Sequence, residues 1–253
     1  MADFVAGAVI AAVAGVIGGA MNALAGGGTF ATLPALIALG LPANIANATS
    51  NFALLPGACS SAFVYRDELR PLGGVKVGWL AFITFLGGLV GGILLVVTPT
   101  RAFDLIIPWL LLFALVVMLF GQRASLWLRS RVSIGARTLI GAQVLLGIYG
   151  GYFGGGVGLI TTALYGLLAG ISVREMFAPR TLMLAMANLA AALIFLWFAM
   201  IDWRAFLPMM VGAVVGGWLG AHVGKKLPAR AVRLWTLCVT AATTTVFFAR
   251  AYG

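Results

Sequence analysis

The sequence is a succession of apolar runs separated by short segments that carry most of the charge. The runs that reach or approach membrane-spanning length are 4–25, 43–65, 76–98, 105–120, 138–153, 182–200, 205–223 and 234–249. A helix needs about 20 predominantly apolar residues to cross a bilayer. Charged residues make up only 9% of the chain, against roughly 25% in soluble domains. The chain cannot cover these runs with polar surface, so they predict a polytopic integral membrane protein.

Backbone hydrogen bonding narrows the fold class further. In hydrocarbon, only helices and closed barrels satisfy every lipid-exposed backbone group, and the alternating pattern of a membrane barrel is absent here. The predicted fold is therefore all-α. The formal net charge of +10 does not indicate nucleic-acid binding, because the basic residues are scattered between apolar runs. Lys and Arg that flank membrane spans on the cytoplasmic side explain this charge better.

Internal similarity indicates a duplication. AGGGTF at 25–30 resembles FGGGVG at 153–158, GGLVGG at 87–92 resembles GGWLGA at 216–221, and PTRA at 99–102 resembles PARA at 228–231. All three matches lie 128 or 129 residues apart and in the same order. We therefore divide the chain into a first repeat (1–122), a basic connecting loop (123–137) and a second repeat (138–253).

Each repeat is expected to contain a helix broken by glycines, or a helical hairpin, followed by three transmembrane helices. The short apolar pieces after the breaks are 29–39 and 157–169, and the longer helices are 43–65, 73–98, 102–121, 173–200, 205–223 and 230–249. An ordinary tight loop between two helices is the alternative for each break. Glycines spaced four apart, such as those at 212, 216 and 220, favour close helix packing.

Basic residues orient the two repeats. The connecting loop carries Arg123, Arg129, Arg131 and Arg137 and no acid, and the segment 225–233 carries Lys225, Lys226, Arg230 and Arg233 and no acid. Both segments are expected in the cytoplasm. The repeat partner of 225–233 is the segment 99–104. Counting helices from the connecting loop places this segment, and both chain termini, on the outer side of the membrane. Equivalent loops on opposite sides predict an inverted-topology repeat, an architecture of secondary transporters with alternating access.

The two glycine breaks and nearby polar residues form the predicted substrate site. A helix N-terminus attracts anions through its free N–H groups and its dipole, although each break could also be a hinge without a ligand. Arg180, at the repeat position of Ser50, would lie about 12 Å deep at 1.5 Å per residue if its helix began near Ser172. It would then need an anionic partner, unless it reaches the cytoplasmic interface instead. The candidate substrate-binding residues are Gly26, Gly27, Gly28, Thr29, Asn47, Ser50, Asn51, Tyr152, Gly154, Gly155, Gly156, Arg180 and Thr181.

Four segments resemble the sulfite exporter TauE/SafE family: AGGGTFATLPAL, LPANIANATSNF, GGYFGGGVG and FAPRTL. The resemblance covers essentially the whole chain, including the duplication. It implies a multi-pass permease of the cell inner (cytoplasmic) membrane that moves small sulfur-containing anions, such as sulfite or organosulfonates, commonly outward. Pro179-Arg180-Thr181 departs from the small polar residues that we associate with this position in the family.

The functional prediction is a secondary transporter that exports sulfite or an organosulfonate by alternating access. Its expected partners are the small anion and the lipid bilayer, with a homo-oligomer as a further possibility and with no cofactor, no metal and no nucleic acid. The alternatives are a permease for another small organic or inorganic anion, or a membrane subunit that transports nothing itself. An enzyme is disfavoured, because the sequence offers one His, no acid within an apolar run and no nucleophile paired with a base.

Overall fold

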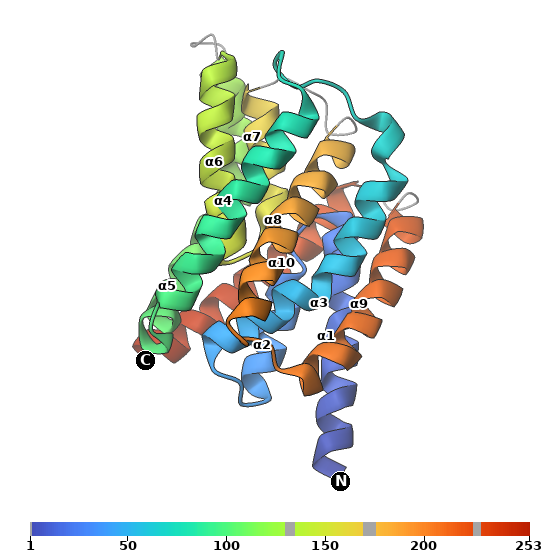
Figure 1. Cartoon of the computed structure of the whole chain (residues 1–253), viewed down its shortest axis with the longest axis vertical. Coiled ribbons are helices and arrows are strands. Elements are labelled where there is room, and N and C mark those ends of the chain that lie inside the picture. The colour runs from blue at the N-terminus through green and yellow to red at the C-terminus, as the bar shows by residue number, and fades with distance from the viewer. Residues whose placement is uncertain (1, 130–134, 169–175, 225–228) are drawn as a thin grey trace.

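The computed structural model describes residues 2–129, 135–168, 176–224 and 229–253. Over these residues the chain forms ten α-helices and one short 3₁₀ helix (Figure 1). The first half contains α1 (Ala2–Leu24), α2 (Thr29–Ala38), α3 (Ala43–Val64), η1 (Arg66–Glu68), α4 (Val77–Val97) and α5 (Thr100–Arg129). The second half contains α6 (Ala136–Tyr152), α7 (Val157–Leu168), α8 (Phe177–Trp197), α9 (Trp203–Gly224) and α10 (Ala229–Tyr252). The predicted all-α fold is confirmed.

Six of these helices are long and apolar enough to cross a membrane: α1, α4, α5, α8, α9 and α10. Their outward faces carry large exposed apolar side chains, for example Val90, Phe113, Val211 and Trp218. A lipid environment satisfies such faces, whereas water does not. The molecule is therefore a multi-pass membrane protein, as predicted. α3 and α6 are outside this set of six, because α3 carries several buried polar residues and α6 has only 17 residues.

Two helix ends differ from those expected. The expected connecting loop 123–137 begins inside a helix, because α5 continues to Arg129 through residues without Gly or Pro that favour helix, and α6 already starts at Ala136. The helix that carries Arg180 begins at Phe177 and not near Ser172, so Arg180 lies in its first turn. Arg131, Ser172, Lys225 and Lys226 lie outside the described residues, and the membrane sidedness of the basic segments stays a prediction.

The two halves exchange helices. α1 packs most extensively on α9, and at the repeat-equivalent positions α6 packs on α4. The same equivalence relates α3–α9 to α8–α4 and α2–α10 to α7–α5. Each half of the packed molecule thus combines three helices of one predicted repeat with the last two helices of the other. We call these assemblies the first mixed bundle (α1, α2, α3, α9 and α10) and the second mixed bundle (α6, α7, α8, α4 and α5).

Glycine contacts fix the directions of these helices. Along the α1–α9 interface, Gly212, Gly216 and Gly220 contact the backbone of Ala12, Val16 and Ala20 in the same order, so α1 and α9 run parallel. Along the α4–α6 interface, Gly147 and Gly151 contact Gly87 and Gly88 in the same order, so α4 and α6 also run parallel. Both chain ends lie at the lower end of the fold in Figure 1. The small-residue spacing in the sequence thus predicts the helix contacts correctly.

Gly216 gives a sharp test of the α1–α9 interface. A Cβ atom at Gly216 would overlap the backbone oxygen of Val16, whereas one at the neighbouring Gly217 would lie 3.8 Å from its nearest atom. We expect Gly216→Ala to destabilise the protein by about 1–3 kcal/mol through overpacking, and to lower its thermal unfolding midpoint in detergent by several degrees. The control Gly217→Ala should leave the midpoint unchanged or slightly raised, because alanine favours helix. Equal midpoints for the two variants would contradict this packing.

Candidate functional site

Both triple-glycine segments interrupt the helical backbone, as predicted. The first break separates α1 from α2, with Gly26 at φ +80°. The second separates α6 from α7, with Gly154 at φ +72° and Gly156 at φ +76°. Left-handed backbone of this kind is readily adopted only by glycine. The sequence therefore uses glycine at these positions to turn the chain within the protein.

Each break folds the short helix back beside the long helix that precedes it. In the first hairpin the Gly28 N–H donates to Asn22 Oδ1 at 2.8 Å, and a Cβ at Gly18 of α1 would lie 2.6 Å from the Thr32 side chain of α2. In the second, the Tyr149 hydroxyl donates to the Gly155 carbonyl at 2.7 Å. The short helices are thus the second arms of hairpins, in agreement with the broken-element interpretation.

The first break touches the first turn of the helix that follows the second break. A Cβ at Gly26 would lie only 2.5 Å from Cα of Gly158, and a Cβ at Gly158 would lie 2.6 Å from Cα of Gly26. Side chains are absent from both surfaces, so backbone meets backbone. The first turn of α7 is therefore brought directly against the end of the first hairpin. We call this contact the break junction, defined by Gly26 and Gly158.

Arg180 lies beside the break junction. Its Cδ is 3.4 Å from the Cβ position of Gly158, its guanidinium donates to the Ala23 carbonyl at 3.3 Å, and it lies 4.6 Å from the centroid of the Phe177 ring. The residue is only 6% exposed. The ion pairs of the described residues, Arg66–Asp67 and Arg250–Asp104, do not include it. Its charge is stabilised by a helix C-terminal carbonyl and a ring face, and by no described carboxylate.

Two asparagines of α3 contact the second break. Asn47 Nδ2 donates to the Tyr152 carbonyl at 3.1 Å, and Asn51 Nδ2 lies 2.7 Å from the Cβ position of Gly154. Both residues are at most 1% exposed. Asn47 Oδ1 and both polar atoms of the Asn51 amide have no hydrogen-bond partner. A buried polar atom without a partner costs about 1–3 kcal/mol, so these three atoms make this place a candidate binding site.

The contacts of Asn47 and Arg180 are equivalent under the duplication. Asn47 binds the carbonyl of Tyr152 before the second break, and Arg180 binds the carbonyl of Ala23 before the first break. Tyr152 and Ala23 are 129 residues apart, the same offset that relates the repeated motifs. In both halves, a polar residue in the first turns of the third helix therefore holds a carbonyl near the end of the helix that precedes the opposite break.

The remaining predicted residues are divided between this centre and its supports. Ser50 and Thr32 form a hydroxyl–hydroxyl hydrogen bond of 2.5 Å within the first half, and the Thr181 hydroxyl donates to the Phe177 and Ala178 carbonyls of its own helix. The Tyr152 side chain turns towards Thr98 and the Phe103 ring. The others are buried in the breaks or in the first turn of α2: Gly27, Gly28, Thr29, Gly155 and Gly156.

Sequence reasoning did not assign three further buried residues to the candidate site. Gly158 was not separated from other glycines, because the contact that makes it special involves a distant segment. Asn22 is the polar residue nearest to the first break on its N-terminal side, which is the signal that could have identified its bond to Gly28. Asn188 in α8 is 2% exposed with an unpartnered Oδ1, and its polarity within an apolar run could have identified it.

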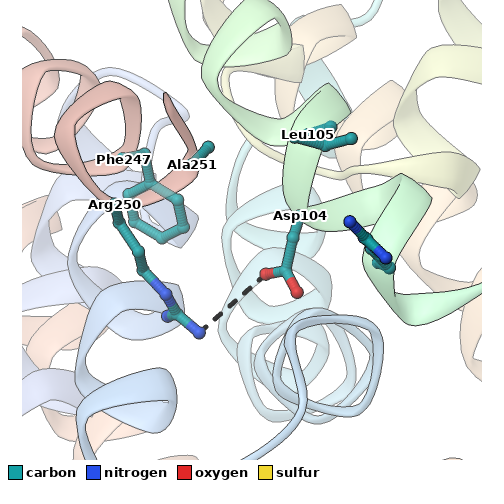
Figure 2. A pocket seen from close by; sticks show the side chains of 6 residues that line it. Asp104, Leu105, Phe247, Arg250 and Ala251 are labelled. Carbon is teal, nitrogen blue, oxygen red and sulfur yellow. Dashed lines mark ion pairs between the residues drawn. The ribbon is translucent and has the colours of Figure 1, made fainter. Parts of the chain in front are cut away.

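The residues of this centre are buried. The two pockets described lie elsewhere, one between α5 and α10 (Figure 2) and one at the surface near Trp203 and Leu207. Among the described residues, no group of three His, Cys, Asp or Glu side chains is arranged to hold a metal ion. The chemistry available at the centre is thus hydrogen bonding by amides, backbone groups and one guanidinium.

Apolar helices of membrane-spanning length around a buried polar centre define a multi-pass helical membrane protein. The family described as sulfite exporter TauE/SafE matches residues 11–247, and the chain belongs to this family. The chain is similar to a probable membrane transporter protein of Haemophilus influenzae, with 29% identity over 90% of each chain. It is also similar to the probable membrane transporter proteins ORF9 of a Sinorhizobium species, with 27% identity over 87% of this chain and 84% of the relative, and YfcA of Escherichia coli K12, with 27% identity over 83% and 80%. No solved structure matches it significantly. Family and relatives together identify a membrane transporter.

Proposed function

We propose that the protein is a secondary transporter that binds one small anion at the break junction and releases it on either side of the membrane in turn. The observation that carries the proposal is the cluster of unpartnered amide atoms of Asn47 and Asn51 next to the second break, with Arg180 close to the same segment. Asn51 contacts Gly154 and Arg180 contacts Gly158, so both reach the N-terminal end of α7.

The charge of the site favours an anion over a cation or a neutral solute. The N-termini of α2 and α7 supply the positive ends of two helix dipoles. Arg180 adds a full positive charge that no described carboxylate neutralises. Broken helices in transporters direct such N-termini at anionic substrate groups. An oxyanion could accept hydrogen bonds from the Asn51 amide and from the guanidinium.

Alternating access is supported by the directions of the helices. α1 is parallel to α9 and α4 is parallel to α6, while the start of α5 beyond α4 lies next to the start of α3, where Thr100 donates to Asn44. α3 and α4 are therefore antiparallel. These directions are those expected if the predicted repeats are inverted relative to one another, and movement between the two mixed bundles would then open the break junction to each side in turn.

Sulfite or an organosulfonate is the substrate that we propose, with export across the cell inner membrane. Membership of the TauE/SafE family supports this choice. An interior-negative membrane potential would itself favour the exit of an anion, by about 2.3 kcal/mol per elementary charge at 100 mV.

A screen of small anions against detergent-purified protein tests the binding function. We expect sulfite or a simple sulfonate such as methanesulfonate to raise the thermal unfolding midpoint, because a ligand at 100 times its Kd stabilises the native state by about 2.7 kcal/mol. Chloride and sodium gluconate at equal ionic strength serve as controls. The stabilising anion should then be transported into proteoliposomes made with the same protein.

The outcomes separate the alternatives. Stabilisation by phosphate or a carboxylate, with none by sulfite or sulfonates, would retain the anion transporter and reject the sulfur substrate. Stabilisation without flux in a well-folded sample would favour a membrane subunit that transports nothing itself.

A further inference from the structure

A second group of charged residues lies away from the break junction, at the end of the molecule that carries both chain ends. Arg101, Asp104 and Leu105 of α5 and Phe247, Arg250 and Ala251 of α10 line a cavity of about 250 Å³. Figure 2 shows Arg250 and Asp104 reaching towards one another from the two helices. We call this cavity the arginine pocket. It carries two positive charges and one negative charge.

The ion pair in the arginine pocket leaves Arg250 incompletely satisfied. Its guanidinium is 3.9 Å from the Asp104 carboxylate, and the two side chains are 47% and 35% exposed. Charge-assisted hydrogen bonds are about 2.7–2.9 Å long, and exposed ion pairs contribute little to stability. Arg250 can therefore exchange Asp104 for another oxyanion at small cost to the fold.

The predicted membrane orientation does not explain why Arg101 and Arg250 lie at this end of the molecule. The start of α5 and the end of α10 are at the end predicted to face outside, where membrane proteins carry fewer Lys and Arg than on the cytoplasmic side. Arg101 and Arg250 nevertheless line the same pocket there. A role in binding gives a physical reason for their presence that membrane orientation does not.

A line of contacts joins the arginine pocket to the break junction. Phe247 lines the pocket and is only 3% exposed. One helical turn before Phe247 in α10, the Thr243 hydroxyl donates to the Phe30 carbonyl at 3.0 Å. The Phe30 ring in turn lies 3.0 Å from the Cβ positions of both Gly27 and Gly156, one in each break. Phe247 and Phe30 thus separate the pocket from the centre.

From these observations we propose that the arginine pocket is a second oxyanion site, at the outer mouth of the path that leads to the break junction. This inference rests on the proposed function. The transported anion displaces Asp104 from Arg250 and occupies the space between Arg101 and Arg250, and Phe247 closes the inner side of the pocket. The same chemistry would accept the phosphate of an anionic lipid headgroup, since the Trp109–Tyr252 hydrogen bond beside the pocket is typical of a membrane interface.

Two substitutions that break the same ion pair distinguish binding from a structural role. Asp104→Asn raises the charge of the pocket by one unit and Arg250→Gln lowers it by one. We expect Asp104→Asn to lower the half-saturating sulfite concentration for uptake into phosphatidylcholine proteoliposomes at low ionic strength. Arg250→Gln should raise it, each by roughly five-fold, with unchanged maximal rates. A shift in the same direction for both variants, or no shift, would overturn the proposal.

Detergent measurements separate the two sources of the oxyanion and the two proposals. Sulfite or short-chain phosphatidylglycerol is titrated while the thermal unfolding midpoint is followed. A stabilisation that is lost in Arg250→Gln but kept in Arg180→Gln would assign the binding to the arginine pocket. The ligand that produces this stabilisation shows whether the pocket binds the soluble anion or the lipid headgroup. If neither ligand shows such a component, the pocket proposal fails, while sulfite flux that depends on Arg180 would leave the proposed function standing.

Discussion

Arg180→Gln is expected to reduce sulfite flux in proteoliposomes by at least about tenfold, because a hydrogen bond from a charged donor contributes about 1.5–3 kcal/mol. Among the residues that the structure describes, Arg180 is the only buried charged side chain, and it lies beside the break junction. Glutamine keeps a donor for the Ala23 carbonyl but removes the charge. Arg180→Lys keeps the positive charge but replaces the planar guanidinium by an ammonium group, so it should retain part of the flux.

The comparison of these two variants is needed because Arg180 also has a structural role. Its bond to Ala23 places a cation at the C-terminal end of α1, where it stabilises the helix dipole. If this were its whole contribution, glutamine and lysine would both preserve transport in protein that folds normally by size-exclusion chromatography. Normal flux through Arg180→Gln would therefore remove Arg180 from the site.

Asn51→Leu should raise the thermal stability of the protein and abolish transport. Both polar atoms of the Asn51 amide are buried without a partner, and leucine has a similar size with no polar group to satisfy. Removing this cost of about 1–3 kcal/mol should raise the unfolding midpoint in detergent by a few degrees. The amide contact with the anion is lost at the same time, so sulfite should no longer stabilise the variant.

Asn44→Leu in the same helix is the matched control. Asn44 Oδ1 accepts hydrogen bonds from the Thr100 hydroxyl at 3.1 Å and from the Ile45 N–H at 3.0 Å. Its replacement leaves the Thr100 hydroxyl without this acceptor, so the midpoint should fall. A higher unfolding midpoint for Asn51→Leu and a lower one for Asn44→Leu would identify Asn51 as a residue kept for binding at the expense of stability. A loss of stability in Asn51→Leu, with flux preserved, would show an ordinary packing role.

Local patterns in the sequence were sufficient for the helices and for the two breaks. Hydrophobic length predicts the spans, and three consecutive glycines destabilise a helix strongly enough to predict the break between Leu24 and Thr29. The start of the helix that carries Arg180 was wrong by about one turn, because helix ends depend on capping and on tertiary contacts that a hydrophobic run does not record.

The arrangement of the site depends on contacts between distant segments. The sequence offered Asn47, Asn51 and Arg180 as polar residues at membrane depth, which is a local signal. It did not indicate that Gly26 would touch Gly158, or that the fourth helix of each repeat would pack with the first helix of the other. Ser50 and Thr181 were predicted for their polarity, yet their hydroxyl groups are used by neighbouring protein atoms.

The most direct test of an anion site at the break junction is a crystal structure of the protein with selenite, a heavier analogue of sulfite that is located by its anomalous scattering. The central claim predicts an anomalous peak between α3 and the start of α7, within hydrogen-bond distance of Asn51 or the Arg180 guanidinium, and its loss in Arg180→Gln. Selenite found only outside this region, in protein that transports it, would contradict the claim.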